Sequence, residues 1–272
     1  MSRIKILLSS LLALMVVGSV ASATASAELN GPWWRHPMLG QQVKFPQNKT
    51  QQVKGINAGG FEIKTENVAF FCGEALLEGV IWNGAHQGQD QAKLQLLKCR
   101  VTRPVPCEFT PVKISQAKVY TELMWKYHGQ PTELHEAGGQ QKIYDAFAPT
   151  AQPNQEGRAP FVTIAIPPGC FLPEQLTLWA KGSSAQYEDA QQGTHPIVWG
   201  TAAEVAPQNQ DSPALLLKWA DPNVEFLHHQ EKPVKAELQL EDEVGVFEKA
   251  NLQGGLRIER QQGQEEFGAF DQ

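Results

Sequence analysis

Long apolar segments are absent after residue 20, and this excludes a membrane-spanning helix from the rest of the chain. The one long apolar run, residues 6–20, follows Arg3 and Lys5 and precedes the small residues Ala25-Ser26-Ala27. This order is typical of a secretory signal peptide. We predict that residues 1–27 are a signal peptide and that residues 28–272 form a single secreted β-rich domain. The mature chain would be periplasmic, on the cell surface or secreted, with no integral membrane segment.

Positive charge is also scarce. The chain has 23 Lys and Arg residues against 29 Asp and Glu residues, and removal of Arg3 and Lys5 takes the formal net charge from −6 to −8. Nucleic-acid partners require basic surfaces that neutralise phosphates, so we expect no nucleic-acid partner. An acidic balance favours cationic ligands, metal ions included.

The common catalytic signatures are missing: the sequence contains no GxSxG, HExxH, HxH, GxGxxG or P-loop motif. We therefore lean towards a protein that is not an enzyme, without settling the question. A pair of distant carboxylates for glycoside hydrolysis would leave no sequence motif. A periplasmic hydrolase with such a pair is accordingly a third hypothesis, after the two developed below.

Helical periodicity is lacking too, because 18 prolines and 23 glycines interrupt the chain at short intervals. Between these breaks lie short apolar or alternating runs, which are typical of strands. The clearest is 119–128, whose alternation predicts a half-buried strand. We predict an all-β fold, either an antiparallel β-sandwich or an irregular barrel with long loops.

The sequence of residues 68–107 is organised as a β-hairpin. The predicted strands are Val68–Trp82 and Gln91–Val101, and the tip is 83–88, where Gly84 and Gly88 permit a tight turn. Folding about this tip places Cys72 opposite Cys99. Four cysteines in an exported chain favour disulfides, so we predict the pairs Cys72–Cys99 and Cys107–Cys170.

Seven histidines are candidate metal ligands, since imidazole is a common ligand of copper and zinc. Prolines on both sides keep the segment Pro32-Trp33-Trp34-Arg35-His36-Pro37 extended. Residues two apart in an extended segment share a side, so Trp34 and His36 would project together. His86 lies at the hairpin tip, where a ligand can be presented to solvent.

The Trp34-x-His36 pair, a separate second histidine, a signal peptide and an acidic β-rich domain resemble the copper-repressible, copper(I)-binding surface proteins of methane-oxidising bacteria. In that family an oxidised tryptophan (kynurenine) and two histidines bind copper. The resemblance implies that Trp34 is the modified ligand and His36 the first imidazole, with His86 as the second, ahead of His128 and His195. It implies an exported, non-enzymatic protein that sequesters copper(I) for copper acquisition.

A carbohydrate- or cell-surface-binding β-sandwich module is the alternative function, with a glycan in place of a metal ion as partner. Its basis is the presence of seven tryptophans in a β-rich chain, because indole rings stack on the faces of sugars.

Overall fold

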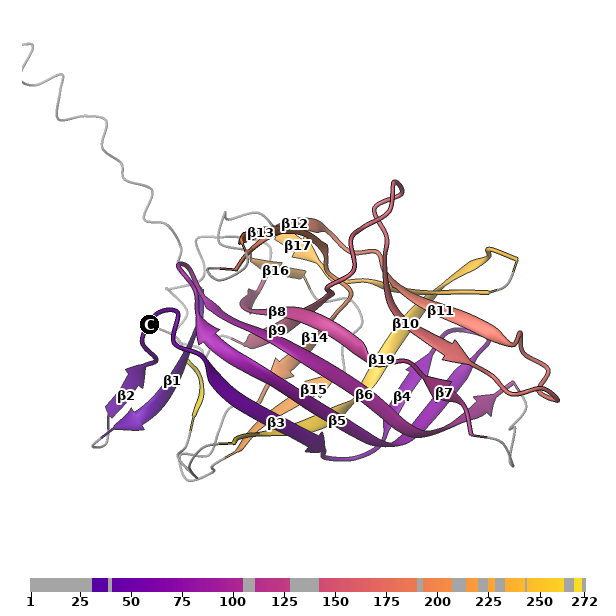
Figure 1. Ribbon diagram of the computed structural model, residues 1–272, viewed down its shortest axis with the longest axis horizontal. Coiled ribbons are helices and arrows are strands. Elements are labelled where there is room, and N and C mark those ends of the chain that lie inside the picture. Colours follow the sequence, from indigo (N-terminus) through magenta and orange to yellow (C-terminus); the bar gives the residue numbers. More distant parts are fainter. Residues whose placement is uncertain are drawn as a thin grey trace, which may run out of the picture.

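The computed structural model describes residues 31–38, 41–104, 111–127, 142–189, 193–206, 214–219, 225–227, 233–242, 244–261 and 267–270. These residues form twenty strands, β1 to β20, and no helix (Figure 1). The all-β prediction is therefore confirmed. Among the described residues, no helix is long and apolar enough to cross a membrane. The predicted signal peptide lies outside the described residues.

The predicted hairpin is present and is the longest among the described residues. It consists of β5 (Ala69–Asn83) and β6 (Gly88–Arg103), and its register pairs Cys72 with Cys99. These two cysteines form a disulfide, as predicted. Cys170 is also disulfide-bonded, and Cys107, its predicted partner, lies outside the described residues.

Eight antiparallel strands close into a ring, which corresponds to the barrel alternative of the predicted fold class. The neighbours around the ring are β3, β5, β6, β8, β9, β14, β15 and β19, and closure comes from pairing between β15 and β19. The strands not yet bounded are β3 (Gln51–Asn57), β8 (Ala117–Lys126), β9 (Ile143–Pro149), β14 (Thr201–Val205), β15 (Ala214–Trp219) and β19 (Phe247–Arg260). The larger hydrophobic cluster contains residues of the ring strands and of strands outside the ring.

A second sheet continues from the ring because β19 is long enough to serve both. Its second half pairs within the ring, and its first half pairs with β18 (Leu238–Glu241) and β4 (Phe61–Lys64). From β18 the sheet runs on through β11 (Gln175–Ala180), β10 (Ala159–Ala165) and β7 (Lys113–Ile114).

Strand β8 is buried on both faces, so the prediction of a half-buried strand is wrong. Val119, Leu123 and Trp125 face the ring interior, as the alternation indicates, but Tyr120 and Met124 on the other face are buried as well. A second hydrophobic cluster covers them. It includes residues of the hairpin β12 (Ser184–Asp189) with β13 (Gly193–Val198), and of β16 (Glu225–Leu227) and β17 (Pro233–Lys235).

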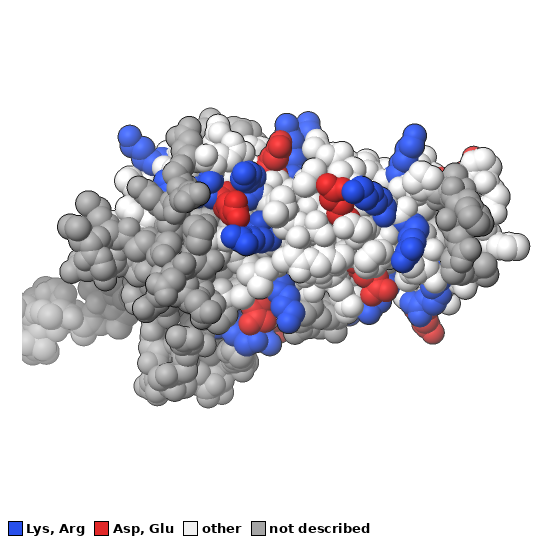
Figure 2. All heavy atoms as spheres, turned by 90° about the horizontal axis from the view of Figure 1, so that it is seen from below, with Lys and Arg blue, Asp and Glu red and all other residues white. Residues whose placement is uncertain are grey.

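One end of the ring is covered by a three-stranded sheet of β2 (Gln41–Lys44), β1 (Trp33–Met38) and β20 (Gly268–Phe270). Trp34, on the central strand β1, is buried and belongs to the ring's hydrophobic cluster. On the face seen in Figure 2, acidic and basic side chains of the described residues are intermingled, with no patch of one sign.

Candidate functional site

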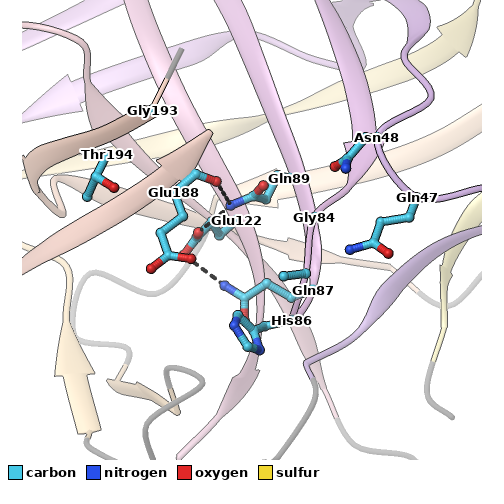
Figure 3. Close-up of a pocket in the computed structure, with 11 residues that line it drawn as sticks. Gln47, Asn48, Gly84, His86, Gln87, Gln89, Glu122, Glu188, Gly193 and Thr194 are labelled. Atoms are coloured by element: carbon cyan, nitrogen blue, oxygen red, sulfur yellow. Dashed lines mark hydrogen bonds between the residues drawn. The ribbon is translucent and has the colours of Figure 1, made fainter. Parts of the chain in front are cut away.

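A pocket of about 380 Å³ lies at the tip of the β5–β6 hairpin. Its lining comes from four places in the chain: the tip itself, the strand β8 beside it, the β12–β13 hairpin, and the segment before β3 (Figure 3). The lining residues are Gln47, Asn48, Gly84, Ala85, His86, Gln87, Gln89, Glu122, Glu188, Gly193 and Thr194. Its volume is in the range of small-molecule sites.

Backbone hydrogen bonds close the turn at the tip and connect it to the segment before β3. The carbonyl of Asn83 accepts a hydrogen bond from the amide of Asn48 at 2.9 Å, and the amide of Gly84 donates to the carbonyl of Gln87 at 2.9 Å. Asn48 has a φ of 58°, a conformation that asparagine tolerates better than most residues. These bonds hold the segment before β3 against the tip and leave the pocket open between them.

A hydrogen-bonded network of Gln87, Glu122 and Gln89 forms the base of the pocket (Figure 3). Glu122 is only 2% exposed. It accepts hydrogen bonds from Nε2 of Gln87 at 2.7 Å and from Nε2 of Gln89 at 2.9 Å. The second contact follows from the strand register, which places Gln89 directly opposite Glu122. Gln89 in turn accepts a hydrogen bond from the indole of Trp82 at 3.1 Å, so its orientation is determined.

One acceptor of this network is unused. Oε1 of Gln87 is buried and has no hydrogen-bond partner among the described residues. Leaving a buried acceptor unpaired destabilises a protein by about 1–3 kcal/mol, and such groups often mark functional sites. No Lys or Arg is among the described residues that line the pocket. The pocket therefore suits a ligand with hydroxyl or amine donors better than a phosphate or carboxylate.

The three predicted copper ligands lie in β1 and in the hairpin tip, at the same end of the molecule. His86 lines the pocket, and its carbonyl accepts a hydrogen bond from the amide of Gly31, just before β1, at 2.8 Å. Trp34 lies in β1, but its indole is buried and donates to the carbonyl of Gln89 at 3.1 Å. His36, half-buried on the same strand, stacks on Phe45 at 5.3 Å between ring centroids.

No group of three or more His, Cys, Asp or Glu side chains is placed to hold a metal ion within the described part of the chain. Of the two further histidine candidates, His195 stacks on Tyr120 at 5.3 Å, and His128 lies outside the described residues. Copper binding through His36, His86 and Trp34 stays a prediction.

The tryptophans do not provide the exposed stacking surface that the carbohydrate hypothesis assumed. Six of the seven are buried, and Trp179 is half-buried with its indole donating to Glu241 at 2.6 Å. Apart from His86, the polar residues of the pocket were not predicted. Glu122 belongs to an alternating strand, Glu188 to the strand β12 and Gln89 to β6, Gln87 belongs to the hairpin tip, and no motif joins these segments.

The hydrolase hypothesis required two carboxylates in one cleft, and the pocket contains Glu122 and Glu188. Glu122 is buried beneath the amides, whereas Glu188 is exposed. The two are connected through Gln89, whose Nε2 also donates to the carbonyl of Glu188 at 3.1 Å.

Comparison with protein-family models, with curated proteins and with solved structures finds no match for this chain.

Proposed function

We propose that the protein binds a small neutral carbohydrate in the pocket at the hairpin tip. The observation that supports this most directly is the Gln87–Glu122–Gln89 network, in which amide and carboxylate groups are fixed by each other and by Trp82. Sugar hydroxyls both donate and accept hydrogen bonds, and side-chain amides and carboxylates offer the complementary groups. Recognition would thus depend on hydrogen bonds instead of tryptophan stacking.

The test is calorimetric titration with glucose, galactose, N-acetylglucosamine, a disaccharide of each, and glucuronate. We expect saturable binding of at least one neutral sugar and none of glucuronate. Replacing Glu188 by Gln should weaken binding by about tenfold, which corresponds to about 1.4 kcal/mol, the range of a hydrogen bond to a charged group. Glu78→Gln is the matched control, because Glu78 is an exposed glutamate outside the pocket.

Absence of binding to every sugar, or equal affinities of the Glu188→Gln and Glu78→Gln variants, would contradict the proposal. Mass spectrometry of the recovered disaccharides separates binding from the hydrolase hypothesis. Intact disaccharides support a binding protein, whereas cleavage that is lost in Glu122→Gln would assign the two carboxylates to catalysis.

Copper(I) sequestration is a second candidate, favoured by one observation: the strand with Trp34 and His36 lies against the tip with His86. We expect His36→Ala to abolish uptake of Cu(I) from a chromophoric chelator without unfolding the protein, and His195→Ala to leave uptake unchanged. A wild-type protein that takes up no copper, with Trp34 unmodified by mass, would eliminate this candidate.

A further inference from the structure

Strands β6 and β8 carry pocket residues on one face and a second group of polar side chains on the other. On β6, Asp90 follows Gln89, and on β8, Thr121 precedes Glu122. The register pairs Gln89 with Glu122 and Asp90 with Thr121. Because successive side chains of a strand point to opposite faces, the first pair faces the pocket and the second faces the ring interior. The two pairs are therefore back to back, one residue apart.

Asp145 of β9 completes the inner group. It pairs with Leu123 of β8, the inward-facing residue after Thr121, and so lies diagonally across from Thr121. Asp90, Thr121 and Asp145 are 6%, 0% and 2% exposed. Oδ1 of Asp145 has no hydrogen-bond partner among the described residues. Two carboxyl groups are thus enclosed in an apolar core without an evident structural use.

No basic side chain of the described residues balances the two carboxyls. The inward-facing neighbours in register are Ile81 of β5, opposite Asp90, and Ala203 of β14, opposite Asp145. Charged residues of the ring strands nearest the pair alternate with the buried ones and so point outward: Glu78, Lys93, Lys118, Glu122, Lys126 and Glu204. Arg260, at the end of β19, shares the inward-facing side but lies over Phe45 and donates to Gln51.

Burial accordingly favours the neutral acids. It raises the pKa of Asp90 to about 7, against the opposing effect of the Thr121 hydroxyl. It also raises the pKa of Asp145 well above its usual value, and the neighbouring Asp90 carboxyl adds to this rise. Below neutral pH the pair holds its protons, and at higher pH negative charge develops inside the ring.

The inner group is tied to the pocket by more than the strand itself. The carbonyl of Asp90 accepts a hydrogen bond from the hydroxyl of Tyr187 at 3.1 Å, and Tyr187 directly precedes the pocket residue Glu188. The carbonyl of Gln89 accepts from the indole of Trp34, and its side chain accepts from the indole of Trp82. A shift of β6 would therefore change the hydrogen bonds of both indoles.

We propose that Asp90 and Asp145 form a proton-operated switch beneath the pocket. In their protonated state they keep β6, β8 and β9 in the arrangement described, and on deprotonation they displace Gln89 and Glu122 from the base of the pocket. The consequence for ligand affinity rests on the proposed function, whereas the switch itself does not.

The test follows the indole N–H resonances of Trp34 and Trp82 by NMR between pH 5 and 9 in the ligand-free protein. We expect both indole resonances to titrate together with the Asp carboxyl ¹³C resonances. The shared midpoint should lie near pH 7. The indole of Trp179, bonded to Glu241, should not share this transition. In Asp90→Asn the shared transition should disappear. Since histidines also titrate near neutral pH, His86→Gln is the control, and in it the transition should persist.

Indoles that do not titrate in the wild type, a transition that survives in Asp90→Asn, or one that vanishes in His86→Gln would overturn the switch. If Asp90→Asn does not fold, Asp145→Asn gives the same comparison, and the carboxyl ¹³C titration of the wild type needs no variant. Should a sugar bind, its affinity is expected to be about tenfold weaker at pH 8 than at pH 6, with no such difference in Asp90→Asn. Failure to bind any sugar contradicts only the proposed function.

Discussion

Trp34 and Asn83 exchange hydrogen bonds at the end of the ring. The amide of Trp34 donates to Oδ1 of Asn83 at 2.8 Å, and Nδ2 of Asn83 donates to the carbonyl of Trp34 at 2.9 Å. Nδ2 also donates to the carbonyl of Phe45 at 2.9 Å. Asn83 is fully buried, so a single side chain connects β1 and the segment before β3 to the hairpin tip.

Replacement of Asn83 by Ala should therefore be strongly destabilising. It removes the side-chain partner of two buried backbone groups, the amide of Trp34 and the carbonyl of Phe45, each worth about 1–3 kcal/mol. The carbonyl of Trp34 still accepts from the amide of Phe45 at 3.0 Å. We expect the free energy of unfolding to fall by at least about 2 kcal/mol, measured by chemical denaturation. Gln186→Ala, at an exposed position of β12, should change it little. Equal stabilities of the two variants would contradict the role assigned to Asn83.

The buried aspartates predict an unusual pH dependence of stability. Because the pKa values of Asp90 and Asp145 are raised in the folded state, that state binds more protons than the unfolded chain between about pH 4 and 7. Stability is thus highest below this window and falls as the pH rises through it.

Asp145→Asn removes one of these acids. At pH 8 we expect its free energy of unfolding to exceed that of the wild type by at least about 1.4 kcal/mol, the equivalent of one pKa unit. Denaturation series from pH 5 to 8 should show a shallower decline for the variant. Parallel curves for the two proteins would show that Asp145 does not retain its proton in the folded state.

The disulfide within the hairpin makes a separate contribution. Cys72 and Cys99 are 27 residues apart in sequence, and the chain-entropy model gives about 3.5 kcal/mol for a closed loop of this length. We expect the double variant Cys72→Ala/Cys99→Ala to lose roughly this amount. Mutation is preferable to chemical reduction, because Cys170 is disulfide-bonded as well. A loss below about 1 kcal/mol would mean that the paired strands alone hold the register.

Gly88 marks a close approach between the hairpin and the strand that covers the ring. A Cβ atom there would lie 2.6 Å from Cδ1 of Leu123 and 2.9 Å from Cδ1 of Trp34. Gly88→Ala should reduce stability by about 1–3 kcal/mol, as overpacking does, and shift the indole N–H resonance of Trp34. Gly73→Ala is the matched control, because its nearest atoms would be 3.8 Å away. Unchanged indole resonances in Gly88→Ala would refute this contact.

The parts of the fold that could be predicted from sequence are those with local signals. The hairpin was predicted because its two apolar runs flank one glycine-containing tip, and the register of Cys72 with Cys99 follows from that symmetry. The strand β15 matches the apolar run Ala214–Trp219. In contrast, the strand β12 has little strand signal in its sequence, because Ser184, Gln186 and Glu188 are polar and exposed on one side.

Ring closure and the buried aspartates could not be predicted in this way. The pairing of β15 with β19, and that of β3 with β5, join residues whose contact leaves no periodicity in the sequence. Asp90 and Asp145 lie within strands, where an acidic residue ordinarily signals an outward-facing position. Only the register of β6, β8 and β9 reveals that both face inward.

Closure of the ring by β15 and β19 also bears on self-association. Each of the eight ring strands is paired with a neighbour on both sides along part of its length, which reduces the backbone donors and acceptors open to another molecule. Outlying strands remain, and these are short: β2 ends in Lys44, β7 begins with Lys113, and β17 spans Pro233–Lys235. Lysine and proline at such positions oppose the addition of a foreign strand. These parts of the folded protein therefore offer few unpaired strand edges to which further molecules could add to form a fibre.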